Sequence, residues 1–310
     1  MRGSPIYQAT QVLENMTVFG QSKHKTKQKA RSAGAKTSHE LGLNLGIHSF
    51  GTANLYRSVW IETQRYGKDN FSVKDIIKLS PNIVSSFLEA KISDGLQYGS
   101  FNAYCSALEK LAVGLNKWKK DHGGEANYDW AAEIQAAKIE ARDVLDRSVA
   151  TRAYQDPVGL IKAISNPVCQ IIAAAQYSIG ARISELDHVN PEQFLGNRQF
   201  HIINGKGGKD RIIKFRHLDA YENFRELVIN NINPYYSKFT FLRNQYRLQL
   251  KAAAGNSGQQ YTGSHGLRWN YAQERFQEVQ QNGSGREQAL VQVSSELGHN
   301  RGDITERYLR

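Results

Sequence analysis

The chain has 310 residues, of which 40% are hydrophobic, so we expect about two domains with substantial cores. A net charge of +11 favours a polyanion such as nucleic acid as the partner. The sequence has no run of 18 apolar residues, no apolar segment near residue 1 and only two cysteines. These features argue against a membrane span, a secretory signal, a disulfide scaffold and a multi-cysteine zinc site, and we expect a cytoplasmic, nucleoid-associated protein.

Residues 1–46 are interpreted as a basic N-terminal arm. Residues 1–50 hold seven basic and two acidic residues, so nearly half of the charge excess lies in about one sixth of the chain. Residues 21–38 contain hardly any large apolar side chain and are expected to be extended or disordered when unbound. A solvated tail that binds nothing is the alternative. The candidate DNA-binding residues of the arm are Lys23, Lys25, Lys27, Lys29, Arg31 and Lys36.

Residues 47–148 show helical periodicity. Leu55, Val59 and Trp60 recur at helical spacing, and Ser80-Pro81 is typical of a helix start. Two apolar stripes follow at residues 83–92 and 104–115, then a polar loop at 119–127 and an alanine-rich helix at 130–147. We therefore predict a small helical bundle that ends in a linker helix.

Residues 149–310 predict a second domain that is mainly helical. Asp156-Pro157 and Asn166-Pro167 open two helices, the second of which ends at Gly180. Residues 199–215 hold two β-branched runs around a Gly-Lys-Gly-Gly-Lys turn, which is typical of a hairpin. Helices are expected near 218–229, 246–254, 265–280 and 288–297, and a short one from Asp303. The fold class is therefore mainly α with a small β-hairpin or sheet.

The second domain contains cations, imidazoles and a tyrosine but no known nucleotide or metal motif. It has no P-loop, HExxH, Asp-rich cluster or GxSxG elbow, so no metal or other cofactor is expected. Arginines can stabilise the extra charge on a phosphodiester under attack, and a lysine or histidine can protonate the leaving alkoxide. A tyrosine nucleophile would conserve the bond energy in a covalent link, which allows resealing without ATP.

Five motifs follow one another in the second domain: Gly180-Ala181-Arg182-Ile183-Ser184-Glu185-Leu186, Gly205-Lys206-Gly207-Gly208-Lys209, His265-Gly266-Leu267-Arg268, Leu297-Gly298-His299 and Tyr308. In order and spacing, these motifs resemble those of the tyrosine recombinase (phage integrase) family. The likeness is strong over about 150–310 and looser over the bundle before it. It implies a two-domain DNA clamp with a helical core-binding domain at 47–148 and a mixed α+β catalytic domain at 149–310.

The resemblance also implies a role for each catalytic residue. Arg182 and Arg268 would grip the scissile phosphate, with Glu185 helping to orient the pocket. Lys206 would protonate the 5′ oxygen as it leaves. His265 and His299 would share hydrogen bonding to the phosphate and proton transfer around the tyrosine. Tyr308 would form the 3′-phosphotyrosine link.

Some positions have a second interpretation. Arg182 and Glu185 could form only a surface ion pair between residues i and i+3. Lys209 competes with Lys206 as the acid and is otherwise expected to contact DNA. Tyr271 is the alternative nucleophile, and Trp269 stands where the family often has histidine, which should change packing rather than chemistry.

The function that the resemblance implies is site-specific recombination of double-stranded DNA through a Holliday junction. It also implies a homo-tetramer on DNA, with a monomer or dimer when free. A type IB topoisomerase, which would relax DNA as a monomer, and a catalytically silent DNA-binding protein on the same scaffold are the alternatives.

Overall fold

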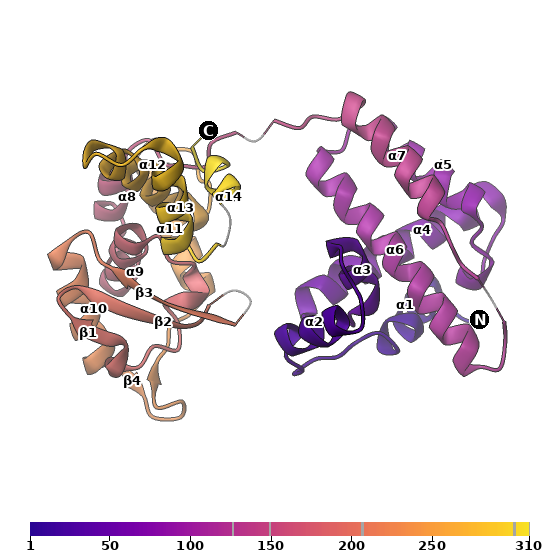
Figure 1. Ribbon diagram of the computed structural model, residues 1–310, viewed down its shortest axis with the longest axis horizontal. Coiled ribbons are helices and arrows are strands. Elements are labelled where there is room, and N and C mark those ends of the chain that lie inside the picture. The colour runs from indigo at the N-terminus through magenta and orange to yellow at the C-terminus, as the bar shows by residue number, and fades with distance from the viewer. Residues whose placement is uncertain (126, 149, 206–207, 300–301, 310) are drawn as a thin grey trace. The chain divides into compact units, whose positions relative to one another are not determined.

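The computed structural model describes residues 1–125, 127–148, 150–205, 208–299 and 302–309. The chain divides into two compact units, Met1–Ser148 and Val149–Arg310, which we call unit 1 and unit 2 (Figure 1). Each unit has its own hydrophobic core. Among the described residues, no helix is both long enough and apolar enough to span a bilayer.

Unit 1 is helical. Helix α4 packs against α6, and α5 packs against α7. Trp60, Phe87 and Phe101 are buried between them, and the Trp60 indole N–H donates to the carbonyl oxygen of Ala107 at 2.7 Å. The elements are α1 (Pro5–Glu14), α2 (Lys23–Ser32), α3 (Ser38–Asn44), α4 (Phe50–Phe71), the 3-10 turn η1 (Ile76–Lys78), α5 (Pro81–Ser93), α6 (Tyr98–Asp121) and α7 (Ala131–Val144).

Helix α1 is part of the core of unit 1, although the sequence analysis placed no helix there. Ala9, Val12 and Leu13 share one face of this helix and are buried against α4 and α6. Gly114 of α6 permits the close approach, because a Cβ at that position would lie 2.6 Å from Cγ1 of Val12. The N-terminal residues therefore contribute packing as well as charge.

The prediction that residues 21–38 are extended or disordered is wrong. Ser22 caps α2, and Thr37 and Glu40 form a capping box at the start of α3. The buried ammonium of Lys110, on α6, donates to carbonyl oxygens at the C-terminal end of α3, those of Gly42, Leu43 and Leu45. Short helices are marginal in isolation, so end caps and a tertiary contact supply what an apolar stripe would otherwise give.

Unit 2 combines helices with a three-stranded antiparallel sheet in the order β1-β2-β3, drawn in pink to orange in Figure 1. In the β2–β3 pair, Phe200 lies opposite Ile213 and Ile202 opposite Arg211. The elements are α8 (Pro157–Lys162), α9 (Pro167–Ile179), η2 (Ile183–Glu185), η3 (Pro191–Gln193), β1 (Phe194–Gly196), β2 (Gln199–Gly205), β3 (Lys209–Lys214), α10 (Leu218–Asn230), β4 (Ile232–Asn233), β5 (Lys238–Phe239), α11 (Arg243–Asn256), α12 (His265–Gln281), α13 (Arg286–Glu296) and α14 (Asp303–Glu306).

The sequence signals at helix ends are confirmed. Ser80, Asp156 and Asn166 are the N-caps of α5, α8 and α9, and each side chain accepts a backbone N–H from the first turn. Gly180 ends α9 in the left-handed conformation, with φ +58°. A Cβ at Gly180 would lie 2.4 Å from Cδ1 of Tyr271, so both the backbone and the close contact with α12 require glycine.

The hairpin predicted at residues 199–215 is also confirmed, as β2 and β3. Strands β1, β4 and β5 were not predicted. Each is only two or three residues long, which is too short for an alternating pattern to show in the sequence.

Candidate active site

The first turn of α12 carries a fully buried arginine, Arg268, which is 0% exposed. Its Nη1 donates to the carbonyl oxygen of Gly180 at 2.5 Å and its Nη2 to that of Leu297 at 2.6 Å. Nη2 also lies 3.1 Å from Nε2 of His299, and Nε lies 3.4 Å from Oη of Tyr308. The guanidinium therefore joins the end of α9, the end of α13 and the C-terminal tyrosine.

The partners of Arg268 in these hydrogen bonds are two carbonyls, an imidazole and a phenol, and no carboxylate is among them. Burial is the largest influence on the Arg268 guanidinium and lowers its pKa to about 10, while Tyr308 acts in the opposite direction. The charge of Arg182 also lowers this pKa, which places Arg182 in the same electrostatic neighbourhood. Arg268 is still charged at neutral pH, and a buried cation without a carboxylate among its hydrogen-bond partners favours the approach of an anion.

Tyr308 follows the short helix α14 and is held by contacts of its ring and backbone. It is 7% exposed, its N–H donates to the carbonyl oxygen of Thr305 at 2.8 Å, and its carbonyl oxygen accepts from Nε2 of Gln273 at 2.9 Å. Its ring centroid lies 5.2 Å from that of Trp269, and Cζ of Arg268 lies 5.8 Å from it. These contacts hold the phenol beside the guanidinium.

The two predicted histidines flank the same tyrosine. The ring centroid of His265 lies 6.2 Å from that of Tyr308, and the ring centroid of His299 lies 6.1 Å from it. His299 follows Gly298, which has φ +71° at the end of α13, and His265 is the first residue of α12. Two helix ends therefore place an imidazole near the phenol.

Arg182 and Glu185 form an ion pair that is largely shielded from solvent. Nη1 of Arg182 lies 2.8 Å from Oε1 of Glu185, and the backbone N–H of Arg182 donates to Oε2 at 2.8 Å, within the η2 turn that follows Gly180. The side chains are 13% and 3% exposed. The interpretation of this pair as a surface contact is therefore wrong.

A second arginine, Arg211 of β3, binds the same carboxylate. Its Nη1 and Nη2 lie 3.2 Å and 2.8 Å from the two oxygens of Glu185, and its Nε donates to the carbonyl oxygen of Glu296 at 2.9 Å. Burial acts to raise the pKa of Glu185, but the hydrogen bonds and charges of Arg211 and Arg182 outweigh it and lower this pKa to about 2. The carboxylate is therefore ionised throughout the neutral range.

Arg211 was not predicted, although the sequence holds a signal for it. Side chains two apart on a strand share a face, so Arg211 lies on the same face as Ile213, which is 3% exposed. A cation on the buried face of a strand needs a partner, and Glu185 was already a candidate for pairing. The sequence does not show, however, that the η2 turn with Glu185 lies next to Arg211 of β3.

The structure thus brings together the predicted residues Arg182, Glu185, His265, Arg268, His299 and Tyr308. Lys206 lies outside the described residues, and the side chain of Lys209 is likewise not described. Within the described ranges, no three His, Cys, Asp or Glu side chains are grouped so as to hold a metal ion.

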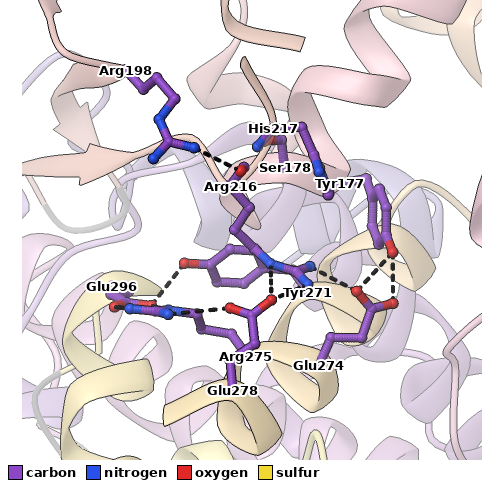
Figure 2. Close-up of polar contacts among 10 residues, drawn as sticks. All are labelled: Tyr177, Ser178, Arg198, Arg216, His217, Tyr271, Glu274, Arg275, Glu278 and Glu296. Atoms are coloured by element: carbon purple, nitrogen blue, oxygen red, sulfur yellow. Dashed lines mark hydrogen bonds and ion pairs between the residues drawn. The ribbon is translucent and has the colours of Figure 1, made fainter. Parts of the chain in front are cut away.

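A separate polar cluster lies further along α12, around a cavity of about 360 Å³ (Figure 2). Arg275 pairs with Glu296 and Glu278 there. Tyr271, the alternative nucleophile, is 1% exposed and donates to Oε2 of Glu296 at 2.7 Å, and burial, followed by Glu296, raises its pKa well above the usual value. The hydroxyl of Tyr271 is therefore engaged in a hydrogen bond to Glu296, which disfavours it as the nucleophile.

The candidate DNA-binding residues of unit 1 belong to α2 and to the segment that joins it to α3. Helix α2 carries Lys23, Lys25, Lys27, Lys29 and Arg31 and has no buried residue. Lys36 lies between α2 and α3, where its backbone N–H donates to the carboxylate of Glu40 at 2.6 Å. The basic segment is thus a solvent-facing helix rather than an unfolded arm.

Comparison by sequence finds no match among protein-family models or curated proteins. Among solved structures, the chain is similar to an integrase of the Tn1549 transposon, described in complex with transposon right-end DNA. The match has a TM-score of 0.56 and 13% identity, and it covers 94% of this chain and 95% of that chain. At this identity the likeness concerns the fold. The expected mainly helical chain with a small antiparallel sheet is therefore confirmed as an integrase-like fold.

Proposed function

We propose that the protein is a site-specific DNA recombinase or integrase that cleaves and rejoins strands through a tyrosine-linked intermediate. The contact between the phenol of Tyr308 and the buried guanidinium of Arg268 supports this most strongly. Arg182 adds a second cation nearby. A nucleophile next to desolvated cations is suited to attack on a phosphodiester, because the charge that develops on phosphorus meets groups already in place.

In the proposed reaction, Oη of Tyr308 attacks the scissile phosphorus. The new bond joins the tyrosine oxygen to phosphorus, and the bond from phosphorus to the 5′ oxygen breaks. Arg182 and Arg268 stabilise the nonbridging oxygens. A 3′-phosphotyrosine remains on the protein, and attack by a 5′ hydroxyl from another strand reseals the DNA without ATP.

Two proton transfers accompany this exchange. The proton of Tyr308 passes to one of the neighbouring imidazoles, His265 or His299, and the departing 5′ oxygen receives a proton from Lys206. Lys209 would contact DNA. The roles of the two lysines are carried over from the tyrosine recombinase resemblance.

The proposed partner is double-stranded DNA, bound in part through α2. The exposed cations of α2 suit the displacement of counterions from phosphates. The similar Tn1549 integrase is described with DNA, which agrees with this partner. Strand exchange through a Holliday junction would require four protomers on DNA.

A covalent capture experiment tests the function and does not require a known target sequence. A pool of duplexes randomised on both sides of a nick is incubated with the full chain, and DNA linked to protein is recovered under denaturing conditions. The wild type should form an adduct that selects a defined sequence. Tyr308→Phe should form none and should bind DNA with nearly unchanged affinity, because only the attacking hydroxyl is removed.

Any other result would indicate a different function or a different nucleophile. DNA binding without any adduct would mean a silent DNA-binding protein. An adduct with relaxation of supercoiled plasmid but no strand exchange would mean topoisomerase activity. An adduct that persists in Tyr308→Phe would move the nucleophile to another residue.

A further inference from the structure

The carboxylate of Glu185 is shared by two arginines in complementary positions. Oε1 accepts from Arg182 and Arg211 side chains, and Oε2 accepts from the Arg182 backbone and the Arg211 side chain. Arg211 and Glu185 are only 11% and 3% exposed in their side chains. A carboxylate bound on both oxygens by planar guanidinium groups has little rotational freedom, so the Arg182 guanidinium attached to it is also fixed.

The second effect of Arg211 concerns the net charge around Arg182. Arg182 and Glu185 alone would form a neutral pair, and a neutral pair attracts a phosphate weakly. Arg211 adds one positive charge, so the group of three has a net charge of +1 in a region where screening by water is limited. Arg211 therefore leaves the positive charge of Arg182 available to an anion.

Arg211 also supports the turn that carries His299. Helix α13 ends in a Schellman motif, in which the N–H groups of His299 and Gly298 bond to carbonyls of the last helical turn. The next two carbonyls, those of Glu296 and Leu297, accept from Arg211 and Arg268 respectively. The Arg211 guanidinium packs so closely on this turn that a Cβ at Gly298 would lie 2.9 Å from Nη1.

We propose that Arg211 is a positioning residue for strand cleavage: through Glu185 it orients Arg182 and keeps its charge available, and through the Glu296 carbonyl it fixes the turn before His299. This assignment rests on the proposed function. Arg211 does not touch the reacting phosphate in this scheme, and its effect passes through the residues that it holds.

The first test measures the rate of adduct formation in a single turnover at saturating protein. Arg211→Met should lower this rate by about 10²-fold, comparable to the loss of one preorganised donor, with DNA affinity changed only a few-fold. Arg211→Lys should also be slow, because lysine keeps the charge but cannot bind both carboxylate oxygens. Arg216→Met is the matched control: Arg216 lies just after β3, its side chain is nearly as little exposed as that of Arg211, and it pairs with two carboxylates, Glu274 and Glu278.

A double variant isolates the charge effect. In Arg211→Met, Glu185 is left to neutralise Arg182, so the added change Glu185→Gln should restore the rate by at least about tenfold. A double variant no faster than Arg211→Met would overturn the claim that Arg211 keeps the charge of Arg182 available. An unchanged rate in Arg211→Met, or an equal loss in Arg216→Met, would overturn the proposal as a whole.

A readout that needs no catalysis distinguishes this proposal from the function on which it rests. In the ¹⁵N–¹H NMR spectrum of the full chain, the guanidinium signals of Arg182 should show restricted rotation and slow solvent exchange. Arg211→Met should abolish both, and Arg216→Met should leave them unchanged. A wild type that forms no adduct but shows this pattern would disprove the recombinase function alone, whereas unchanged Arg182 signals in Arg211→Met would disprove the positioning role.

Discussion

Arg268 of unit 2 and the cations of α2 in unit 1 differ in their exposure to solvent. In unit 2, the guanidinium of Arg268 is fully buried, and each of its nitrogens has a defined partner. In unit 1, the cations of α2 lie on a helix without a single buried residue. A buried charged group is held in one orientation, and its electrostatic interactions are stronger than in water. Exposed charges are hydrated, and salt screens them over about 8 Å at physiological ionic strength. The first arrangement suits chemistry at one atom, and the second suits affinity for a polyanion.

The largest effect should come from a change at the buried arginine. Arg268→Lys keeps a positive charge but cannot reach the carbonyls of Gly180 and Leu297 together with Tyr308. We expect adduct formation at saturating DNA to fall by about 10³-fold, with DNA affinity within a few-fold of wild type. Single-turnover kinetics on a suicide substrate measures the rate, and a filter or anisotropy assay measures affinity.

The control for this variant lies on the same helix. Arg275→Lys removes a guanidinium that pairs with Glu296 and Glu278, two turns further along α12. Its rate of adduct formation should stay near that of the wild type. An equal loss in both variants would show that α12 as a whole, rather than the Arg268 guanidinium, supports cleavage.

An intermediate effect should come from neutralising α2. Replacing Lys25, Lys27, Lys29 and Arg31 by glutamine should reduce the slope of log affinity against log salt by about 0.9 for each phosphate that the helix no longer neutralises. The rate of cleavage in preassembled complexes should not change. Affinity measured between 50 and 200 mM salt, the range over which such slopes are resolved, checks this expectation.

The control for this prediction is Thr26→Ala with Gln28→Ala, which alters the same helix without altering its charge. This variant should leave the salt slope intact, whereas either of two other results would change the interpretation of α2. If the glutamine variant instead loses discrimination between specific and random DNA, α2 recognises a sequence. An unchanged slope in the glutamine variant would mean that α2 does not contact DNA.

The smallest effect concerns acid stability. Because the pKa of Glu185 is lowered to about 2 in the folded chain, its ion pairs contribute their full stability above the ordinary glutamate pKa, near 4.3. This contribution is lost as the pH falls from there towards 2. Glu185→Gln should therefore flatten the pH dependence of unfolding in that window, by up to about 1.4 kcal/mol per pH unit. Urea unfolding of both proteins at several pH values between 5 and 2.5 provides the comparison.

Local signals in the sequence were sufficient for much of the fold. Proline with a preceding cap at Ser80, Asp156 and Asn166 acts within one helical turn, so no distant contact is needed to predict where those helices start. Gly180 is similar, because the left-handed end of α9 is a property of one residue. Helix α2 was missed because it has no apolar stripe, and α3 because its C-terminal end is held by Lys110, a residue far away in the chain.

The candidate site also contains residues that the sequence could predict and one contact that it could not. Its motif residues could be named from type and order, and the structure places six of them near one another. The pairing of Arg211 with Glu185 could not be predicted, because it depends on where the η2 turn lies relative to β3. Trp269 is intermediate: a packing role was expected, and its ring is 5% exposed and lies against Tyr308.

The contact between Arg268 and Tyr308 determines which subunit supplies the groups that cleave a strand. Both groups belong to one chain, so on the proposed function the nucleophile and the buried arginine come from the same subunit, and each subunit cleaves in cis. Mixing two inactive proteins, one lacking the phenol and one lacking the guanidinium, could then not rebuild an active site. Any alternation between subunits during strand exchange would have to act by moving Tyr308 relative to Arg268 within a subunit, rather than by lending a nucleophile to a neighbour.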